Sequence, residues 1–190
     1  MFKAEFMTNI IGITQIAIAI ITLIFAIKIP ISIMHFQRYT NLMTFYASFE
    51  FAHSYQSVIN FFCDVCGRDV EKIAQNYKER FLKDFEKYKN KEIELCDILH
   101  YQRRLLNDYF FELEMCRKSS LFLKKIIKRD WTSSEAWVIK IIMYMNNAVD
   151  SDPVMKKKIS CIKYDAKPEI KGMNKTLLKL YEVLKVKSSN

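Results

Sequence analysis

Four residues of the chain have the types and the spacing of zinc ligands. Cys63 and Cys66 form a C-x-x-C pair, and Gly67 after it permits a tight turn. Cys96 and His100 are four positions apart, so on one helix they project from the same face. Zinc prefers four tetrahedral thiolate or imidazole ligands, and this set has the residue types of a structural zinc site. A lone C-x-x-C pair is weak evidence and the second pair has no standard spacing, so we favour the alternative that these cysteines are ordinary buried residues and that the protein needs no cofactor.

A carboxylate and an imidazole, Glu50 and His53, lie one helical turn apart in an aromatic stretch, Tyr39–Cys63, that has no other formal charge. If this stretch is a second membrane helix, the two form an intramembrane polar pair that faces a partner helix. The alternative is an amphipathic helix outside the bilayer that continues from the first helix, and the polar residues of the stretch favour it. A hairpin also places Lys28 and Arg38 outside, against the positive-inside rule.

Basic side chains gather in two clusters in the second half of the chain. The chain has 30 Lys and Arg residues against 21 Asp and Glu residues, for a formal net charge of +9. The clusters are Lys124, Lys125, Lys128 and Arg129, and Lys156, Lys157 and Lys158. They suit contact with anionic lipid or with another polyanion such as nucleic acid. Neither cluster is interleaved with aromatic residues that would stack on bases, which favours lipid or solvent.

The sequence contains no motif of an enzyme active site. Three glycines are too few for a Gly-rich phosphate-binding loop, and neither a His-Glu-x-x-His motif nor a nucleophile elbow occurs. The three histidines, His35, His53 and His100, are scattered along the chain. We therefore expect a protein that is not an enzyme.

The first element that positions these residues has the length and composition of a membrane anchor. The 22 residues from Phe6 to Ile27 carry no charge, and as a helix they span about 33 Å, enough to cross a hydrocarbon core of about 30 Å. This run is too long for a cleaved signal peptide. The residues expected inside the bilayer include Ile10, Ile16, Ile20, Leu23 and Ile27. The basic residues that follow predict that the C-terminal part lies in the cytoplasm.

The remainder of the chain has the 3.6-residue periodicity of helices. Apolar stripes predict one helix up to Lys89 and a second from about Glu92 to Arg117. A short basic helix, Leu121–Arg129, follows, and the capping box that begins at Thr132 opens another. Val154–Lys171 fits either a strand or a helix. The predicted buried residues of the last two helices are Trp137, Ile141, Tyr144, Met145 and Ala148, and Leu177, Leu178, Tyr181 and Leu184.

These elements predict an all-α protein with an N-terminal transmembrane helix, or a two-helix hairpin, followed by a small cytoplasmic bundle of four to six helices. The expected divisions are an anchor at 1–28, a juxtamembrane or second membrane helix at 29–63, and a basic helical domain at 64–190. The near-zero mean hydropathy of the chain is thus an average over an apolar N-terminal part, residues 1–63, and a basic C-terminal part, residues 64–190.

This layout resembles that of small transmembrane effector proteins of bacterial anti-phage systems of the abortive-infection type, including those encoded beside retron reverse transcriptases. The resemblance is carried by Ile10–Ile27, by the layout of the chain and by the run Leu105-Leu106-Asn107-Asp108-Tyr109-Phe110-Phe111-Glu112. It implies a protein of the bacterial inner membrane that a reverse-transcriptase–nucleic-acid complex or another defence protein holds inactive. It transfers no site residues.

Two functions follow as hypotheses. In the first, the protein is a defence effector that forms homo-oligomers when a trigger releases it, disrupts the inner membrane and causes abortive infection. In the second, it is a non-enzymatic scaffold or adaptor, tethered to the membrane, that binds a protein or nucleic-acid partner.

Overall fold

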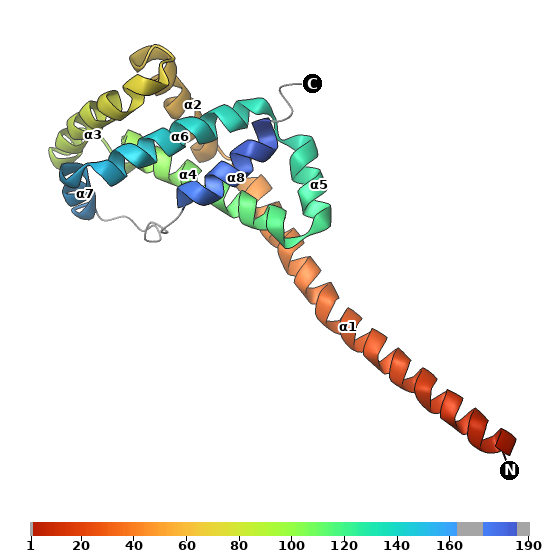
Figure 1. Ribbon diagram of the computed structural model, residues 1–190. Helices are drawn as coiled ribbons and strands as arrows, with labels where there is room; N and C mark the ends of the chain where they lie inside the picture. The colour runs from red at the N-terminus through yellow and green to blue at the C-terminus, as the bar shows by residue number, and fades with distance from the viewer. Residues whose placement is uncertain (1, 163–172, 186–190) are drawn as a thin grey trace. The chain divides into compact units, whose positions relative to one another are not determined.

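The computed structural model describes residues 2–162 and 173–185, with side chains described from residue 14 onward (Figure 1). These residues form eight α-helices and a few single turns of other helix types, with no strand among them, which confirms the all-α class. The chain divides into two compact units, Met1–Thr40 and Asn41–Asn190.

Helix α1 (Phe2–Tyr46) is longer than the predicted anchor. It contains Pro30, and two of its threonine hydroxyls are satisfied locally: Thr22 Oγ1 donates to the carbonyl of Ile18 over 2.9 Å, and Thr40 Oγ1 to that of Phe36 over 3.0 Å. Such bonds to the preceding turn let a polar side chain lie on an apolar helix without an unsatisfied donor. The helix therefore presents an apolar surface over most of its length.

The stretch predicted to continue from the anchor as one helix is broken. Helix α1 ends at Tyr46, and α2 (Phe49–Asn60) begins after Ser48, whose Oγ accepts a hydrogen bond from the Phe51 amide over 3.2 Å. A turn of π-helix, Phe61–Val65, follows α2. At 12 residues, α2 is about 18 Å long, too short to cross a hydrocarbon core of about 30 Å. Among the described residues, only α1 is long and apolar enough to span a membrane.

The remaining helices begin and end close to the predicted breaks. Ser120 separates α4 from α5, and Thr132 and Glu135 form the predicted capping box of α6. A helix that begins at Pro153 covers the first part of Val154–Lys171, the stretch that fitted either strand or helix, and residues 163–171 of that stretch lie outside the described residues. The bounds are α3 (Ile73–Lys89), α4 (Leu99–Ser119), α5 (Leu121–Asp130), α6 (Ser133–Ser151), α7 (Pro153–Ser160) and α8 (Met173–Lys185).

The helix predicted from Glu92 begins seven residues later, at Leu99. A turn of 3-10 helix, Leu95–Asp97, comes first, and Ile98 is then extended with ψ of 121°. The Asp97 carboxylate accepts from the amide of Glu94 over 3.2 Å, which favours this separate turn over an extra turn of α4. Cys96 and His100 consequently lie on different elements.

Helix α4 is at the centre of the second unit, where it packs against α2, α5, α6 and α8. Figure 1 shows α4, α6 and α8 side by side. Leu106, Phe110 and Leu113 are fully buried on α4. Next to them lies an aromatic cluster in which the ring centroids of Tyr109 and Trp131 are 5.8 Å apart.

Amides connect the same three helices inside the core. Asn146 Nδ2 on α6 donates to Asn107 Oδ1 on α4 over 2.9 Å and to Asn174 Oδ1 on α8 over 2.7 Å. Arg103 on α4 donates to Asn146 Oδ1. Buried polar groups that satisfy each other in this way specify one arrangement of the helices.

Three side chains predicted to be buried are exposed: Trp137 and Tyr144 on α6, and Leu178 on α8. The buried face of α6 is instead centred on Val138, Ile142 and Met145, because α3, α4 and α8 all pack against this helix. Position 137 then lies at the edge of the buried face, where its side chain remains 51% exposed.

Candidate functional site

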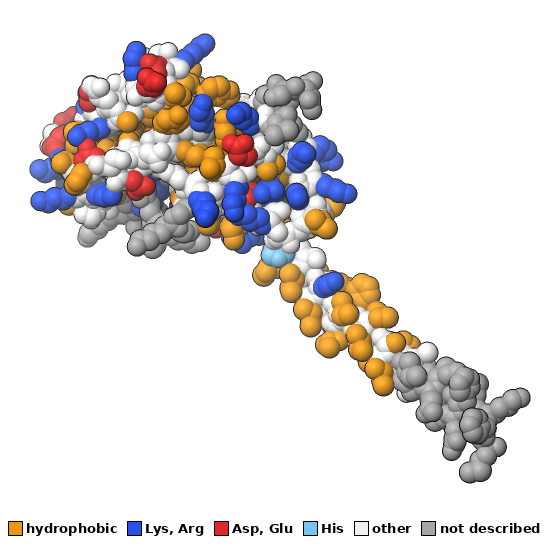
Figure 2. Space-filling view, viewed as in Figure 1, with side chains coloured by type: hydrophobic (Ala, Val, Ile, Leu, Met, Phe, Trp, Pro, Cys, Tyr) orange, Lys and Arg blue, Asp and Glu red, His pale blue; other side chains and the backbone are white. Residues whose placement is uncertain are grey.

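The apolar surface of α1 is uncovered in the first unit. Ile16 and Leu23 are 63% and 62% exposed, and Ile20 and Ile27 are also exposed. None of the most apolar part of the helix is buried. Figure 2 shows apolar side chains on the described part of this helix. Ile10, also expected in the bilayer, lies outside the residues whose side chains are described.

A contiguous exposed apolar surface of this kind is rare on soluble proteins and marks a membrane or protein contact. Such a surface follows from the sequence, because 22 uncharged residues leave a helix no charged face. The helix also continues apolar beyond Lys28, with Ile29, Ile31 and Phe36 exposed.

Helix α5 carries the first basic cluster on an amphipathic helix. Leu123 and Ile127 are buried on one side, whereas Lys124, Lys125, Lys128 and Arg129 are all exposed. At 100° per residue, Lys125 and Lys128 lie opposite the buried pair. Figure 2 shows Lys and Arg side chains gathered over this helix. The sequence anticipated the cations but not their neighbours, Leu121 and Phe122, which are 80% and 60% exposed.

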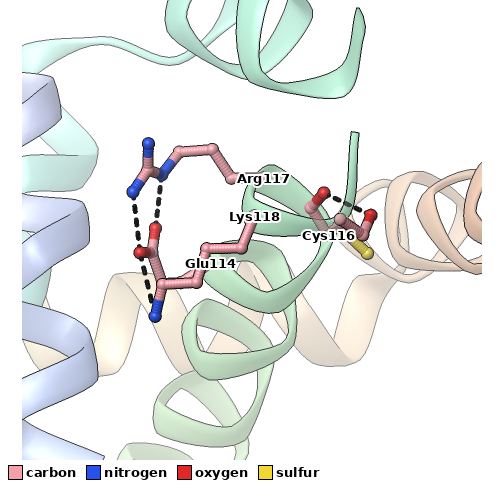
Figure 3. A network of polar contacts seen from close by, with 5 residues as sticks. Glu114, Cys116, Arg117 and Lys118 are labelled. Atoms are coloured by element: carbon pink, nitrogen blue, oxygen red, sulfur yellow. Dashed lines mark hydrogen bonds and ion pairs between the residues drawn. The ribbon is translucent and has the colours of Figure 1, made fainter. Parts of the chain in front are cut away.

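An ion-pair network fixes the end of α4 immediately before α5 (Figure 3). The buried Glu114 carboxylate accepts from Arg117 Nε over 2.5 Å and from Arg117 Nη2 over 2.8 Å, and Lys118 Nζ is 3.4 Å away. Hydrogen bonding to Glu114 raises the pKa of Arg117. Ser119 Oγ donates to the Cys116 carbonyl over 2.7 Å, and Ser120 Oγ then caps α5 by accepting from the Phe122 amide over 3.2 Å. Together these bonds position the basic helix.

The second basic cluster makes more contacts within the chain. Lys158 Nζ is 2.9 Å from Glu86 Oε1 and lies 4.4 Å from the centroid of the Phe85 ring. Lys156 Nζ donates to the Asp150 carbonyl over 2.7 Å. Lys157 is exposed. This cluster therefore differs from the cations of α5, because two of its three ammonium groups are directed at other parts of the bundle.

The predicted zinc ligands are dispersed. His100 is buried, and its Nδ1 lies 2.8 Å from the Tyr77 hydroxyl, whereas Cys96 is exposed and Cys63 and Cys66 lie at the end of α2. Burial and the nearby Arg103 lower the pKa of His100 well below its usual range, and burial raises the pKa of Cys66. Among the described residues, no three His, Cys, Asp or Glu side chains are grouped so that they could hold a metal ion.

Glu50 and His53 join α2 to α4 instead of pairing with each other. The Tyr101 hydroxyl donates to Glu50 Oε1 over 3.3 Å, and Gln102 Nε2 lies 3.1 Å from His53 Nε2. Phe49 stacks on the His53 ring at 5.9 Å between centroids. Their contacts are thus those of a helix packed in the bundle.

A polar cavity of about 330 Å³, which sequence reasoning missed, adjoins His53. Its charged lining residues are Asp64, Arg80 and Asp97, and the buried Gln102 closes one side. Arg80 Nε is 2.9 Å from Asp84 Oδ1, so its charge is already compensated. No sequence signal predicts this cavity, because α2, α3 and α4 contribute its residues from distant parts of the chain.

The fold and the exposed surfaces define a class: a helical-bundle protein with one N-terminal helix that is long and apolar enough to span a membrane. No family model, curated protein or solved structure matches the chain.

Proposed function

We propose that this protein is a membrane-anchored effector that disrupts the bacterial inner membrane when a trigger releases it. The observation that carries the proposal is the uncovered apolar surface of α1. A helix of this composition is stable in a bilayer, where its backbone groups are satisfied internally and its side chains meet lipid. The basic residues after Ile27 favour a cytoplasmic location of the bundle.

In this proposal, the bundle is the part that responds to the trigger. It has its own core and its own buried polar network, so it can hold a defined surface for a partner. The exposed cations of α5 suit an acidic surface. We propose that the bundle acts by binding and not by catalysis.

The role in anti-phage defence is proposed from the resemblance to transmembrane effectors of retron and abortive-infection systems. By that analogy, a reverse-transcriptase–nucleic-acid complex or another defence protein holds the bundle inactive, and release allows α1 to associate with copies of itself. Homo-oligomerisation supplies a physical route to permeabilisation, because polar side chains of α1 such as Gln15 can hydrogen-bond between copies of the helix in lipid and line a path there.

The test is expression of the full chain with its genomic neighbours, with and without a trigger, while a potential-sensitive dye reports the inner-membrane voltage. We expect depolarisation and growth arrest on triggering. The Ile20→Arg, Leu23→Arg double variant should abolish both effects, whereas Lys91→Gln, on an exposed loop residue of the bundle, should preserve them. An intact potential with no growth arrest after release would contradict the proposal.

An adaptor is the second candidate function, and an exposed aromatic residue on α6 favours it. Trp137 lies at the surface, with Lys140 Nζ 5.0 Å from the centroid of its ring. Exposed tryptophan is enriched where proteins bind partners. If the protein is an adaptor, Trp137→Ala should release a partner that co-purifies with the full chain and leave the membrane potential unchanged in every condition.

A further inference from the structure

The outward face of α5 combines two apolar side chains with a set of cations, and nothing in the described second unit covers it. Leu121 and Phe122 occupy the first turn and are among the most exposed large apolar residues of the bundle. Lys124, Lys125 and Lys128 follow them on exposed positions within the next two turns. Asp130 lies 2.5 Å from Arg129, which leaves three cations on this helix without an acidic partner on α5 itself.

We infer that this face of α5 docks on anionic lipid, with Leu121 and Phe122 entering the headgroup region and the lysines contacting lipid phosphates. A helix with apolar residues beside lysines is the composition that binds at a membrane surface. Cytoplasmic leaflets carry negative charge that attracts such lysines. Nucleic acid fits the face less well, because Leu121 cannot stack on bases and Phe122 is the one aromatic residue of α5.

The inference rests on the proposed anchoring, which keeps the bundle close to a bilayer. The second unit begins at Asn41, 13 residues after Lys28, and these residues belong to helix α1, so they rise about 20 Å along its axis. Tethering at this range gives a high effective concentration of lipid around the bundle, so a weak surface site becomes occupied.

The bonds around the α4–α5 junction support a surface that is held in one orientation. The Arg117–Glu114 pair and the Ser120 cap fix the start of α5, while Leu123 and Ile127 fix its inner side in the core. Leu121 and Phe122 are therefore held on the same exposed side of the helix as the lysines, and do not fold back onto the bundle. A rigid face of this kind loses little conformational freedom on docking.

The experiment uses the full chain reconstituted in lipid nanodiscs, with a photo-crosslinking amino acid in place of Phe122. Mass spectrometry measures lipid adducts in discs of neutral phosphatidylcholine and in discs with about 30% phosphatidylglycerol, a content that gives a strongly negative surface. We expect at least about tenfold more adducts in the anionic discs, because each lysine near the surface changes binding several-fold. The same crosslinker in place of Trp137, which is exposed on α6, is the matched probe and should show no such preference.

Charge variants complete the test. Lys124→Gln, Lys125→Gln and Lys128→Gln together should reduce the adducts at position 122 about tenfold or more. Lys83→Gln, Lys89→Gln and Lys91→Gln together remove the same charge from exposed positions outside both basic clusters and should leave the adduct yield unchanged. Thermal unfolding of both triple variants confirms that the bundle is intact.

Two results would overturn the inference: equal adduct yields in neutral and anionic discs, or adduct formation with a single-stranded oligonucleotide in place of lipid. Recovery of the chain in the discs reports anchoring separately. A chain that enters discs but gives no anionic adducts therefore contradicts the docking of α5 alone, whereas a chain that stays outside the discs contradicts the proposed anchoring.

Discussion

Helix α1 and the bundle of the second unit contain the same types of apolar side chain, but these side chains are mostly exposed in α1 and mostly buried in the bundle. Both contain isoleucine, leucine and phenylalanine, yet Ile139, Leu113 and Phe110 in the bundle are completely buried, whereas Ile20, Leu23 and Phe25 in α1 are exposed. Burial of such side chains is the main stabilising term in folding. The bundle therefore supplies its own apolar environment, and α1 must obtain one from outside.

The largest effect is expected when charge is placed at the centre of α1, because a charged helix no longer inserts into a bilayer. Ile20→Arg with Leu23→Arg should cost about 5–7 kcal/mol of insertion free energy, at about 2.5–3.5 kcal/mol per arginine. The variant should move from the membrane fraction to the soluble or aggregated fraction when membranes are floated in a density gradient. Thermal unfolding of the bundle should not change, and a variant that still floats with the lipid would contradict this assignment.

The reciprocal change is a cavity in the bundle. Phe110→Ala removes a fully buried ring next to Tyr109, whose ring centroid is 5.4 Å away, and should destabilise the second unit by about 3–5 kcal/mol. Circular dichroism should show a lower melting temperature. Membrane flotation of the same variant should remain at the level of the unsubstituted chain, since the exposed apolar part of α1 makes no use of the Phe110 ring.

A smaller effect is expected at the junction that positions α5. Glu114→Gln removes the carboxylate from Arg117, whose side chain is only 12% exposed, and should cost about 2–4 kcal/mol because a nearly buried cation loses its partner. The melting temperature of the bundle measures this loss. Asp130→Asn, which removes an exposed partner of Arg129, is the control and should change stability by at most about 1 kcal/mol.

The smallest effect is a pH dependence confined to the bundle. The pKa of His100 in the folded chain lies well below its usual range, chiefly because the ring is buried. Below about pH 6.5 the unfolded chain binds a proton at His100 that the folded chain does not, so the free energy of unfolding should fall by up to about 1.4 kcal/mol per pH unit. Melting temperatures between about pH 5 and pH 7 test this, and His100→Asn should flatten the profile.

Much of the fold was predictable because its signals are local. The uncharged run after Glu5, the capping box at Thr132 and the break at Ser120 are each encoded by a few adjacent residues, and the structure places the corresponding helices close to the expected positions. The predicted helix start near Glu92 was wrong, since the Glu94–Asp97 turn competes with the first turns of α4.

The arrangement of side chains between helices was less predictable. The zinc hypothesis assumed that Cys96 and His100 share a helix, and it could not anticipate that His100 lies in the core against Tyr77. The helical periodicity predicted that Trp137 is buried because it lies one turn before the apolar Ile141. Ile141 is indeed buried, but which edge of α6 is covered depends on where α3 and α8 pack. The exposure of Leu121 and Phe122 likewise depends on how α5 packs against the other helices.

The topology that we propose is that α1 crosses a bilayer once and leaves the bundle on the cytoplasmic side. It is tested by labelling an N-terminal tag and the exposed thiols of Cys96 and Cys161 with membrane-impermeant reagents in intact spheroplasts. We expect the tag to react from outside, and both thiols to react only after the membrane is permeabilised. Reaction of the tag and the thiols from the same side would contradict it.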